Sequence, residues 1–376
     1  MIKRTLTIIC CLLAAAANVM ACTSAIIGAS RNPYGRPLLW KHRDTSATDN
    51  KIEYVAGKNG EHSYVGLFNA DDRRLEQAWM GMNDAGFAVM NTASYNIKDD
   101  KVPQKKMDKE GYVMAKALKT CVTVDDFARL LDTLPRPMGV EANFGVIDAY
   151  GDGAYFETNN HSYVRYNLKD APDDVLIRTN FSMSGRPEEG FGFNREANAC
   201  HLLKPHIAAA DITPEILTED VSRSFWHDLK QRDYSAGSDR WVIDQDFIPR
   251  HSSTATVVIE GCRPISKETT PDPGTIAEQY IMWTGLGYPP CSEIVPVWCR
   301  PDGVHNDLRG TLKNGHSLMS DRVKARRDEV FPLKKGNGEK YLDISRLYND
   351  EGTGYVQTLR PKNLETYRAT RALRDK

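Results

Sequence analysis

The sequence has 376 residues, of which 41% are hydrophobic, and its formal net charge is −1. This length and composition are typical of a soluble globular protein with one large domain or two ordinary ones, and they exclude a disordered chain. A near-neutral charge without a basic block also argues against nucleic acid or an anionic membrane as the main partner.

The first 21 residues have the pattern of a secretory signal peptide. A short positive start is followed by an apolar run at 6–17 that is too short to span a bilayer as a helix. Small or aliphatic residues then occupy positions −3 and −1 before Cys22. We therefore expect an exported protein, periplasmic or secreted, with residues 22–376 as one mature domain.

Strands and helices follow in chain order. Runs bounded by turn residues predict strand pairs, and two of these pairs are joined by Asn/Asp-Gly turns typical of tight hairpins. Thr123 is a suitable N-cap for one of the helices, because Asp125 and Asp126 stand in its first turn. Hairpins interrupted by helices indicate an α+β fold with helices packed on sheet layers. The expected strands are 23–29, 37–41, 76–80, 87–92, 144–148, 154–157, 175–179, 254–260, 280–284 and 294–297, and the expected helices are 124–134, 194–203, 213–230 and 320–329.

The chain has eight cysteines, of which Cys10 and Cys11 belong to the signal peptide. The spacing of the other six matches neither a zinc site nor a dense disulfide framework, although an exported protein can form one or two disulfides. The histidines are scattered and no G-x-S-x-G motif is present, so we expect no catalytic metal and no serine α/β-hydrolase.

Cys22 is the residue on which the chemical argument rests. After cleavage before Cys22, the thiol and a free α-amino group belong to the same residue. That amine has an ordinary pKa of ~7.7–8.0, so it can act as a general base near neutral pH and activate the thiol. Two other interpretations remain open: a structural or disulfide cysteine, and a lipoprotein cysteine acylated at position +1, although Met20 is a poor match to a lipobox.

Several motifs after the cleavage site support the catalytic interpretation. They are residues 22–28 (CTSAIIG), 35–44 (GRPLLWKHRD), 81–87 (GMNDAGF), 179–181 (TNF) and 282–289 (MWTGLGYP). In this order they resemble the linear amide C–N hydrolases of the N-terminal nucleophile (Ntn) superfamily. These include choloylglycine hydrolases, penicillin V acylases and, nearest to this chain, the peptidase C45 group of acyltransferase-like proteins.

The resemblance implies a four-layer αββα sandwich with Cys22 at the end of a central strand. It also implies that Asp44 holds the α-amino group of Cys22 and that Asn180 supplies an amide to the oxyanion hole. Asn180 has two competing interpretations, because it can cap a turn and because Asn180-Phe181-Ser182 is a glycosylation sequon.

Other site residues depart from the family pattern. Lys41 stands where much of the family has arginine, and it can favour the thiolate or meet the substrate, although it does not reproduce a bidentate arginine. Arg43 either takes over part of the role of the family's arginine or points to solvent. The family's late arginine corresponds to Arg195 or Arg240, of which we prefer Arg195. Asn91 is a second candidate for the oxyanion hole.

The sequence thus predicts an exported cysteine amidohydrolase that forms an acyl-enzyme on Cys22 and needs no cofactor. Its expected substrate is a small acyl amide or a short peptide. An acyltransferase and a dipeptidase are the alternatives on the same fold. The rival from another class is a non-catalytic surface lipoprotein anchored to a membrane through Cys22. Without lipidation we expect no membrane contact after signal cleavage, and the resemblance also allows a homo-oligomer.

Overall fold

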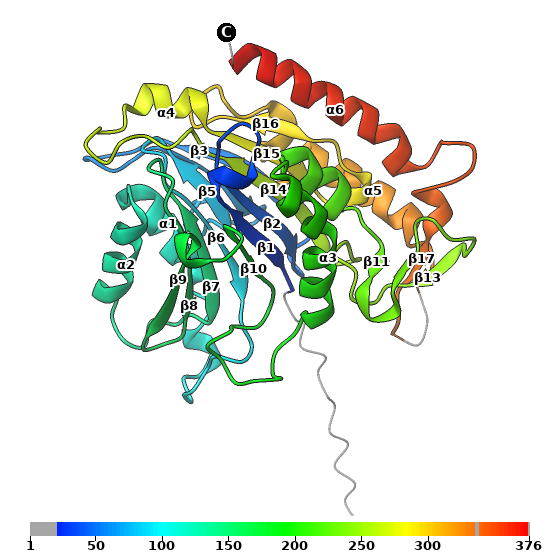
Figure 1. Cartoon of the computed structure of the whole chain (residues 1–376), viewed down its shortest axis with the longest axis horizontal. Helices are drawn as coiled ribbons and strands as arrows, with labels where there is room; N and C mark the ends of the chain where they lie inside the picture. Colours follow the sequence, from blue (N-terminus) through cyan, green and yellow to red (C-terminus); the bar gives the residue numbers. More distant parts are fainter. Residues whose placement is uncertain (1–20, 335–337, 375–376) are drawn as a thin grey trace, which may run out of the picture.

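The computed structural model describes residues 21–334 and 338–374, so the expected signal peptide lies outside the described residues except for Ala21. Two antiparallel sheets form the centre of the molecule (Figure 1). In spatial order the larger sheet consists of β3 (Asn50–Val55), β4 (Tyr64–Asn69), β5 (Met80–Asn83), β6 (Ala88–Ala93), β7 (Ala142–Ile147), β8 (Gly153–Thr158) and β9 (Tyr163–Asn167). The smaller sheet consists of β10 (Val175–Arg178), β1 (Thr23–Ile27), β2 (Leu38–Asp44), β14 (Ser253–Glu260), β15 (Ile281–Leu286) and β16 (Val295–Val297).

Helices cover the outer faces of both sheets, and short ribbons extend one end of the molecule. The helices are α1 (Glu110–Thr120), α2 (Val124–Thr133), α3 (Phe193–Ala209), a π-helix (Ile216–Val221), α4 (Pro273–Gln279), α5 (Leu318–Val330) and α6 (Tyr355–Arg374). The ribbons pair β11 (Trp226–His227) with β12 (Arg232–Asp233), and β13 (Trp241–Ile243) with β17 (Tyr341–Asp343). Among the residues that the structure describes, no helix combines the length and apolar character needed to cross a membrane.

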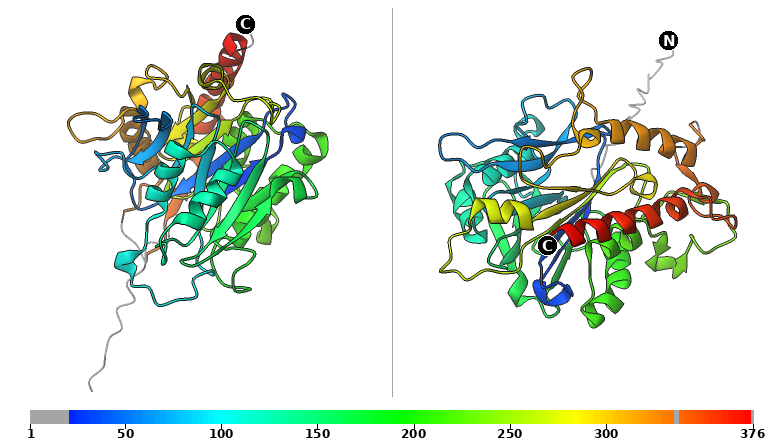
Figure 2. Two further views of the ribbon diagram at one scale, coloured as in Figure 1. Left: turned by 90° about the vertical axis from the view of Figure 1, so that its left-hand side faces the viewer. Right: turned by 90° about the horizontal axis from the view of Figure 1, so that it is seen from above.

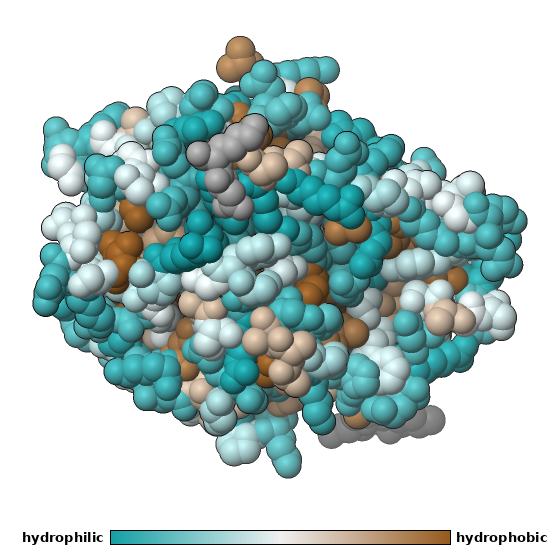
Figure 3. All heavy atoms as spheres, turned by 45° about the horizontal axis from the view of Figure 1, so that its top comes forward, coloured by the Kyte–Doolittle hydropathy of each residue, from teal (hydrophilic) through white to brown (hydrophobic). Residues whose placement is uncertain are grey.

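The layers form the expected αββα sandwich. Figure 1 shows α1 and α2 on one side, the two sheets in the middle and α3 on the other side. One hydrophobic core fills the space between the sheets and continues under α1 and α2. A second core lies between the six-stranded sheet and the layer of α3, the π-helix and α6, which crosses the molecule in Figure 2. The face seen in Figure 3 is mostly hydrophilic, and its hydrophobic residues form small separate groups.

The alternation of side chains along β1 and β2 determines which face of the sheet carries each site residue. Ile26 and Leu39 are cross-strand neighbours and belong to the core between the sheets, whereas Trp40 belongs to the core under the helices. Because successive strand residues point to opposite faces, Lys41 and Arg43 share the inner face of Leu39. His42 and Asp44 share the outer face of Trp40.

Most predicted elements are confirmed within a few residues. The helix predicted at 124–134 is α2, and Thr123 forms a capping box with Asp126. The strand predicted at 37–41 is β2, which extends to Asp44. The six cysteines of the described chain are all free, so it contains none of the disulfides that the sequence allowed.

Two predicted elements are wrong. The strand predicted at 76–80 begins only at Met80, where β5 starts. The helix predicted at 213–230 is reduced to the π-helix Ile216–Val221 and is followed by turns and β11. The chain leaves the helix because Phe225 turns into the core, where its ring packs against those of Phe247 and Tyr348.

Candidate active site

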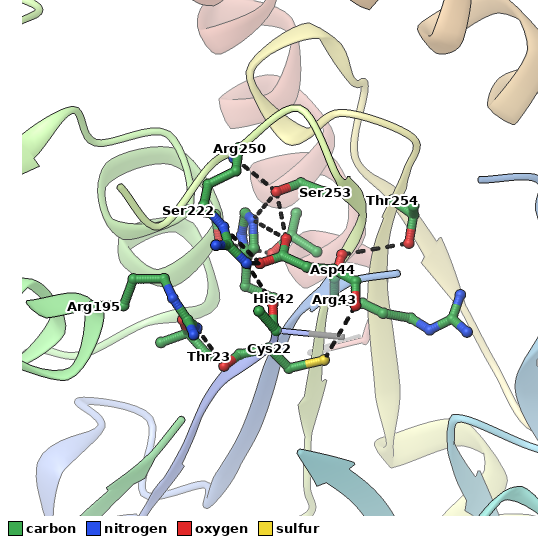
Figure 4. Close-up of polar contacts among 12 residues, drawn as sticks. Cys22, Thr23, His42, Arg43, Asp44, Arg195, Ser222, Arg250, Ser253 and Thr254 are labelled. Carbon is green, nitrogen blue, oxygen red and sulfur yellow. Dashed lines mark hydrogen bonds and ion pairs between the residues drawn. The ribbon is translucent and has the colours of Figure 1, made fainter. Parts of the chain in front are cut away.

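Cys22 is buried and directly precedes β1, which lies between β10 and β2 in the six-stranded sheet. Its Sγ lies 3.8 Å from the main-chain oxygen of Asp44, which it contacts as a thiol donor (Figure 4). The carbonyl of Ala21, which belongs to the Ala21–Cys22 peptide bond, accepts a hydrogen bond of 3.3 Å from Arg250 Nη2. The described chain therefore has an arginine at the bond whose cleavage would release the Cys22 amine.

Asp44 lies at the end of β2 and is fully buried. Ser253 Oγ donates to its Oδ1 at 2.6 Å, and Arg250 donates to its Oδ2 from Nη2 at 2.8 Å and from Nε at 3.2 Å (Figure 4). Burial opposes the charge of Arg250, but the Asp44 carboxylate raises its pKa above the ordinary value. Asp44 is thus held as the partner of a cation directly beside Cys22.

The arginine paired with Asp44 is one that the sequence did not single out. Arg240, one of the two late candidates, instead bonds Asp343 and has a largely exposed side chain. Ser253 is the first residue of β14, and Arg250 lies just before this strand. β14 pairs with β2 so that Ser253 lies opposite Asp44. The sequence predicted the strands at 254–260 and 37–41, but local sequence does not specify that these two strands pair. Knowledge of that pairing would have pointed to Ser253 and Arg250.

His42 shares the outer face with Asp44. Its Nε2 lies 2.8 Å from Ser253 Oγ and 3.6 Å from Asp44 Oδ1. The hydroxyl of Ser253 has one proton, which it donates to Asp44, so His42 donates from Nε2 to the Ser253 oxygen. Burial lowers the pKa of His42 to about 4, although Asp44 opposes this shift. His42 is therefore neutral near pH 7 and orients the Ser253–Asp44 pair without charge.

Lys41 lies on the inner face, fully enclosed. Its Nζ donates to Asn91 Oδ1 and to the main-chain oxygen of Trp79, both at 2.8 Å. Burial lowers the pKa of Lys41 to about 7, and the nearby Cys22 opposes this shift. The structure thus brings Lys41 and Asn91 together, and Asn91 uses its oxygen to hold the lysine.

Arg43 does not point to solvent. It is buried on the inner face, where Nη1 donates to Asn50 Oδ1 and Nη2 donates to Asn69 Oδ1 at 2.8 Å. Its guanidinium stands 5.3 Å from the centre of the Trp79 ring. Burial lowers the pKa of Arg43 to about 10, while Cys22 and Asp44 favour its charge.

Asn180 and Arg195 meet beside Cys22. Arg195 Nη1 donates to the main-chain oxygen of Cys22 at 2.6 Å, and its Nη2 donates to Asn180 Oδ1 at 2.7 Å. Asn180 Nδ2 donates to the Ala93 carbonyl at 2.9 Å, which leaves one amide proton for another acceptor. Asn180 is fully buried, so the folded chain does not offer it for glycosylation.

A cavity of about 420 Å³ opens beside this cluster, bordered by Ala21, Arg195 and Arg250. Phe191, Phe193 and Leu229 also line it, and each of these side chains is exposed. An apolar wall with a few polar groups at one end is typical of a small-molecule site.

Two side-chain groups in the described chain have the spacing of metal ligands, and neither shares a member with the cluster around Cys22. Lys324 already pairs with Asp49 in the first of them. The groups are Asp49, His316 and Asp321, and Asp99, Asp100 and His161.

The comparison with known protein families supports the acyltransferase part of the resemblance that the sequence indicates. Residues 35–194 match the family model described as acyl-coenzyme A:6-aminopenicillanic acid acyl-transferase. No curated protein matches the sequence.

The chain is also similar to several solved structures. A Caenorhabditis elegans ortholog of N-acylethanolamine-hydrolyzing acid amidase shares 12% identity over 65% of this chain and 94% of that chain, with a TM-score of 0.39. A mutant of conjugated bile acid hydrolase from Clostridium perfringens shares 11% identity over 76% and 95%, with a TM-score of 0.43. Penicillin V acylase from Agrobacterium tumefaciens shares 13% identity over 74% and 86%, with a TM-score of 0.39.

Proposed function

We propose that this chain, which resembles the acyltransferase-like Ntn hydrolases over residues 35–194, is an exported amidohydrolase with Cys22 as its N-terminal nucleophile. The observation that carries the proposal is the position of Cys22 beside the buried Asp44–Arg250 pair, with Arg250 also bonded to the Ala21 carbonyl. Removal of residues 1–21 would free an amine at this place, next to a carboxylate that can orient it.

In the proposed reaction, the Cys22 amine takes the thiol proton and Sγ attacks the carbonyl carbon of an acyl amide. The remaining amide proton of Asn180 serves the oxygen of the tetrahedral intermediate, and Arg195 fixes the orientation of that amide. The Cys22 amine then returns the proton to the leaving nitrogen, the C–N bond breaks, and a thioester remains on Cys22.

Water completes the cycle. The Cys22 amine takes a proton from water, the resulting hydroxide adds to the thioester carbon, and the C–S bond breaks as the thiol regains its proton. If a second amine replaces water, the same site transfers the acyl group. A short peptide in place of the acyl amide makes the site a dipeptidase. The cavity beside Arg195 and Arg250, with its apolar wall, suits the acyl group.

The first experiment is the intact mass of the exported protein, followed by a screen of acyl amides. We expect a mass that begins at an unmodified Cys22 and turnover that Cys22→Ala abolishes while the far-UV circular dichroism is retained. Cys200→Ala is the matched control, because Cys200 is an exposed cysteine on α3. It should keep full turnover.

Two results would contradict the amidase proposal. A mass that carries lipid, or that starts at another residue, would remove the base and support the lipoprotein alternative. Equal turnover by Cys22→Ala and the parent protein would exclude Cys22 as the nucleophile.

A further inference from the structure

Gly192 is the N-cap residue of α3, three residues before Arg195, and both residues border the cavity beside Cys22. Its backbone has a φ of 94°, in the left-handed region that glycine adopts readily and that other residues rarely adopt. The carbonyl oxygen of Gly192 accepts hydrogen bonds from the Glu196 amide at 2.9 Å and from Thr179 Oγ1 at 3.2 Å. The backbone of Gly192 is therefore fixed at the wall of the proposed site.

The place where a Cβ atom of residue 192 would stand is taken by the guanidinium of Arg195. An ideal Cβ on Gly192 would lie 2.4 Å from Arg195 Nη2 and 2.8 Å from Arg195 Cζ, well inside the ordinary contact distance between non-bonded atoms. It would also lie 2.9 Å from Thr179 Cβ. Among the described glycines with positive φ, Gly192 is the one whose Cβ would meet the charged end of a side chain. The lack of a side chain at this position therefore gives the cation its place.

The nitrogen that this Cβ would meet is the one that holds Asn180. Arg195 Nη2 donates to Asn180 Oδ1 at 2.7 Å. Nη1 of the same guanidinium donates to the Cys22 carbonyl and to Thr23 Oγ1 (Figure 4). The guanidinium is planar and rigid, so a shift of Nη2 moves the whole group. Thr179, the other residue in contact with the Cβ, directly precedes Asn180 in the chain. Both displacements that an added Cβ would cause therefore act on Asn180.

An added methyl group at this position can be accommodated without loss of the fold. Arg195 Nη2 is at the far end of a long side chain, and Arg195 borders a cavity of about 420 Å³ into which that end can move. We therefore expect the guanidinium to give way, rather than the sheet or α3. The cost then falls on the Asn180 amide, whose second proton is the one that the proposed reaction uses.

We propose that Gly192 is a positioning residue of the reaction: because it has no side chain, Arg195 can hold the Asn180 amide toward the oxygen of the tetrahedral intermediate. The proposal rests on the amidase function proposed above. That oxygen develops its charge only as the reaction proceeds, so a misplaced amide slows the chemical step more than it weakens substrate binding. The expected signature of a substitution at Gly192 is therefore a lower kcat at a nearly unchanged KM.

The test compares Gly192→Ala with Gly60→Ala in protein that begins at Cys22. Gly60 has a φ of 85°, and an added Cβ there would have no atom within 4 Å, so Gly60→Ala introduces the backbone strain without the clash. We expect Gly192→Ala to lower kcat for an acyl amide roughly ten- to a hundredfold, with KM within about twofold of the parent value. Gly60→Ala should keep the parent kcat and KM, and far-UV circular dichroism verifies the fold of both variants.

A second pair of variants shows whether the effect passes through Arg195, and it serves even if Gly192→Ala alone folds poorly. In Arg195→Ala the guanidinium is gone, so the further change Gly192→Ala should lower kcat by less than about twofold. A further loss of tenfold or more in that background, or a kcat of folded Gly192→Ala equal to that of Gly60→Ala, would refute the positioning role while the amidase stands. If parent protein that begins at Cys22 cleaves no amide at all, the amidase proposal itself fails, and this inference falls with it.

Discussion

Lys41 combines a position beside the nucleophile with a charge that depends on pH near neutrality. Burial lowers its pKa from 10.5 to about 7, so the folded protein has an ammonium below about pH 7 and a neutral amine above it. If this charge favours the Cys22 thiolate, kcat/KM falls on the alkaline side as Lys41 loses its proton. In Lys41→Arg the guanidinium stays charged, so we expect the alkaline limb to move up by at least one pH unit.

The measurement is kcat/KM between pH 5 and pH 10 for both proteins. Lys98→Arg is the control, because Lys98 is a partly exposed lysine that pairs with Glu141 and with no residue of the site. This variant should leave the profile unchanged. Superimposable alkaline limbs for the parent and Lys41→Arg would show that the charge of Lys41 does not govern the rate.

At the residue scale, the sequence predicted the members of the site that lie in one hairpin. Cys22, Lys41 and Asp44 belong to the β1–β2 unit, so a local motif of 23 residues is enough to bring them together. Asn180 and Arg195 were predicted from the family resemblance, and they do lie beside Cys22. The neutral hydrogen-bond partners of Arg43 were not predictable, because Asn50 and Asn69 come from other strands.

The pairing of β2 with β14 is the element-scale feature that completes the site. It places Ser253 opposite Asp44 and brings Arg250 to the same carboxylate, more than 200 residues along the chain. Local sequence does not distinguish Arg250 from Arg195 or Arg240, since the choice depends on which strand lies beside β2. Long-range pairing is what a local pattern leaves open.

Removal of the Asp44 charge should lower both stability and activity, and a second substitution at Arg250 can separate the two effects. Asp44→Asn leaves the Arg250 cation without its partner, so we expect a loss of about 3 kcal/mol in the free energy of unfolding and a drop of about a hundredfold or more in kcat. The double variant Asp44→Asn/Arg250→Met removes both charges and should regain part of the stability but none of the activity. Urea unfolding followed by tryptophan fluorescence and turnover of one amide measure both. Full activity in Asp44→Asn would refute its role at the amine.

The difference between local sequence patterns and long-range contacts also explains why most of the helix predicted at 213–230 does not form. Its sequence has the spacing of an amphipathic helix, but the chain is diverted after the π-helix because Phe225 packs against Phe247. In contrast, the α2 helix was predicted well because its capping box and apolar face are both local. In this segment, tertiary packing overrides the local pattern because the helix competes with the burial of the Phe225 ring.

At the scale of the whole molecule, α6 closes the second core from the end of the chain. Tyr367 is fully buried, its ring lies 4.3 Å from that of Trp283 in β15, and its hydroxyl bonds Thr218 at 2.7 Å. We expect Tyr367→Ala to lower the free energy of unfolding by about 4 kcal/mol, and Tyr367→Phe by about 1 kcal/mol. Tyr112→Ala, at an exposed tyrosine, should cost far less. Urea unfolding gives these values, and the turnover of folded Tyr367→Ala should stay near the parent level, because neither contact reaches Cys22. A cost for Tyr367→Ala no larger than for Tyr112→Ala would mean that α6 is not part of the cooperative fold.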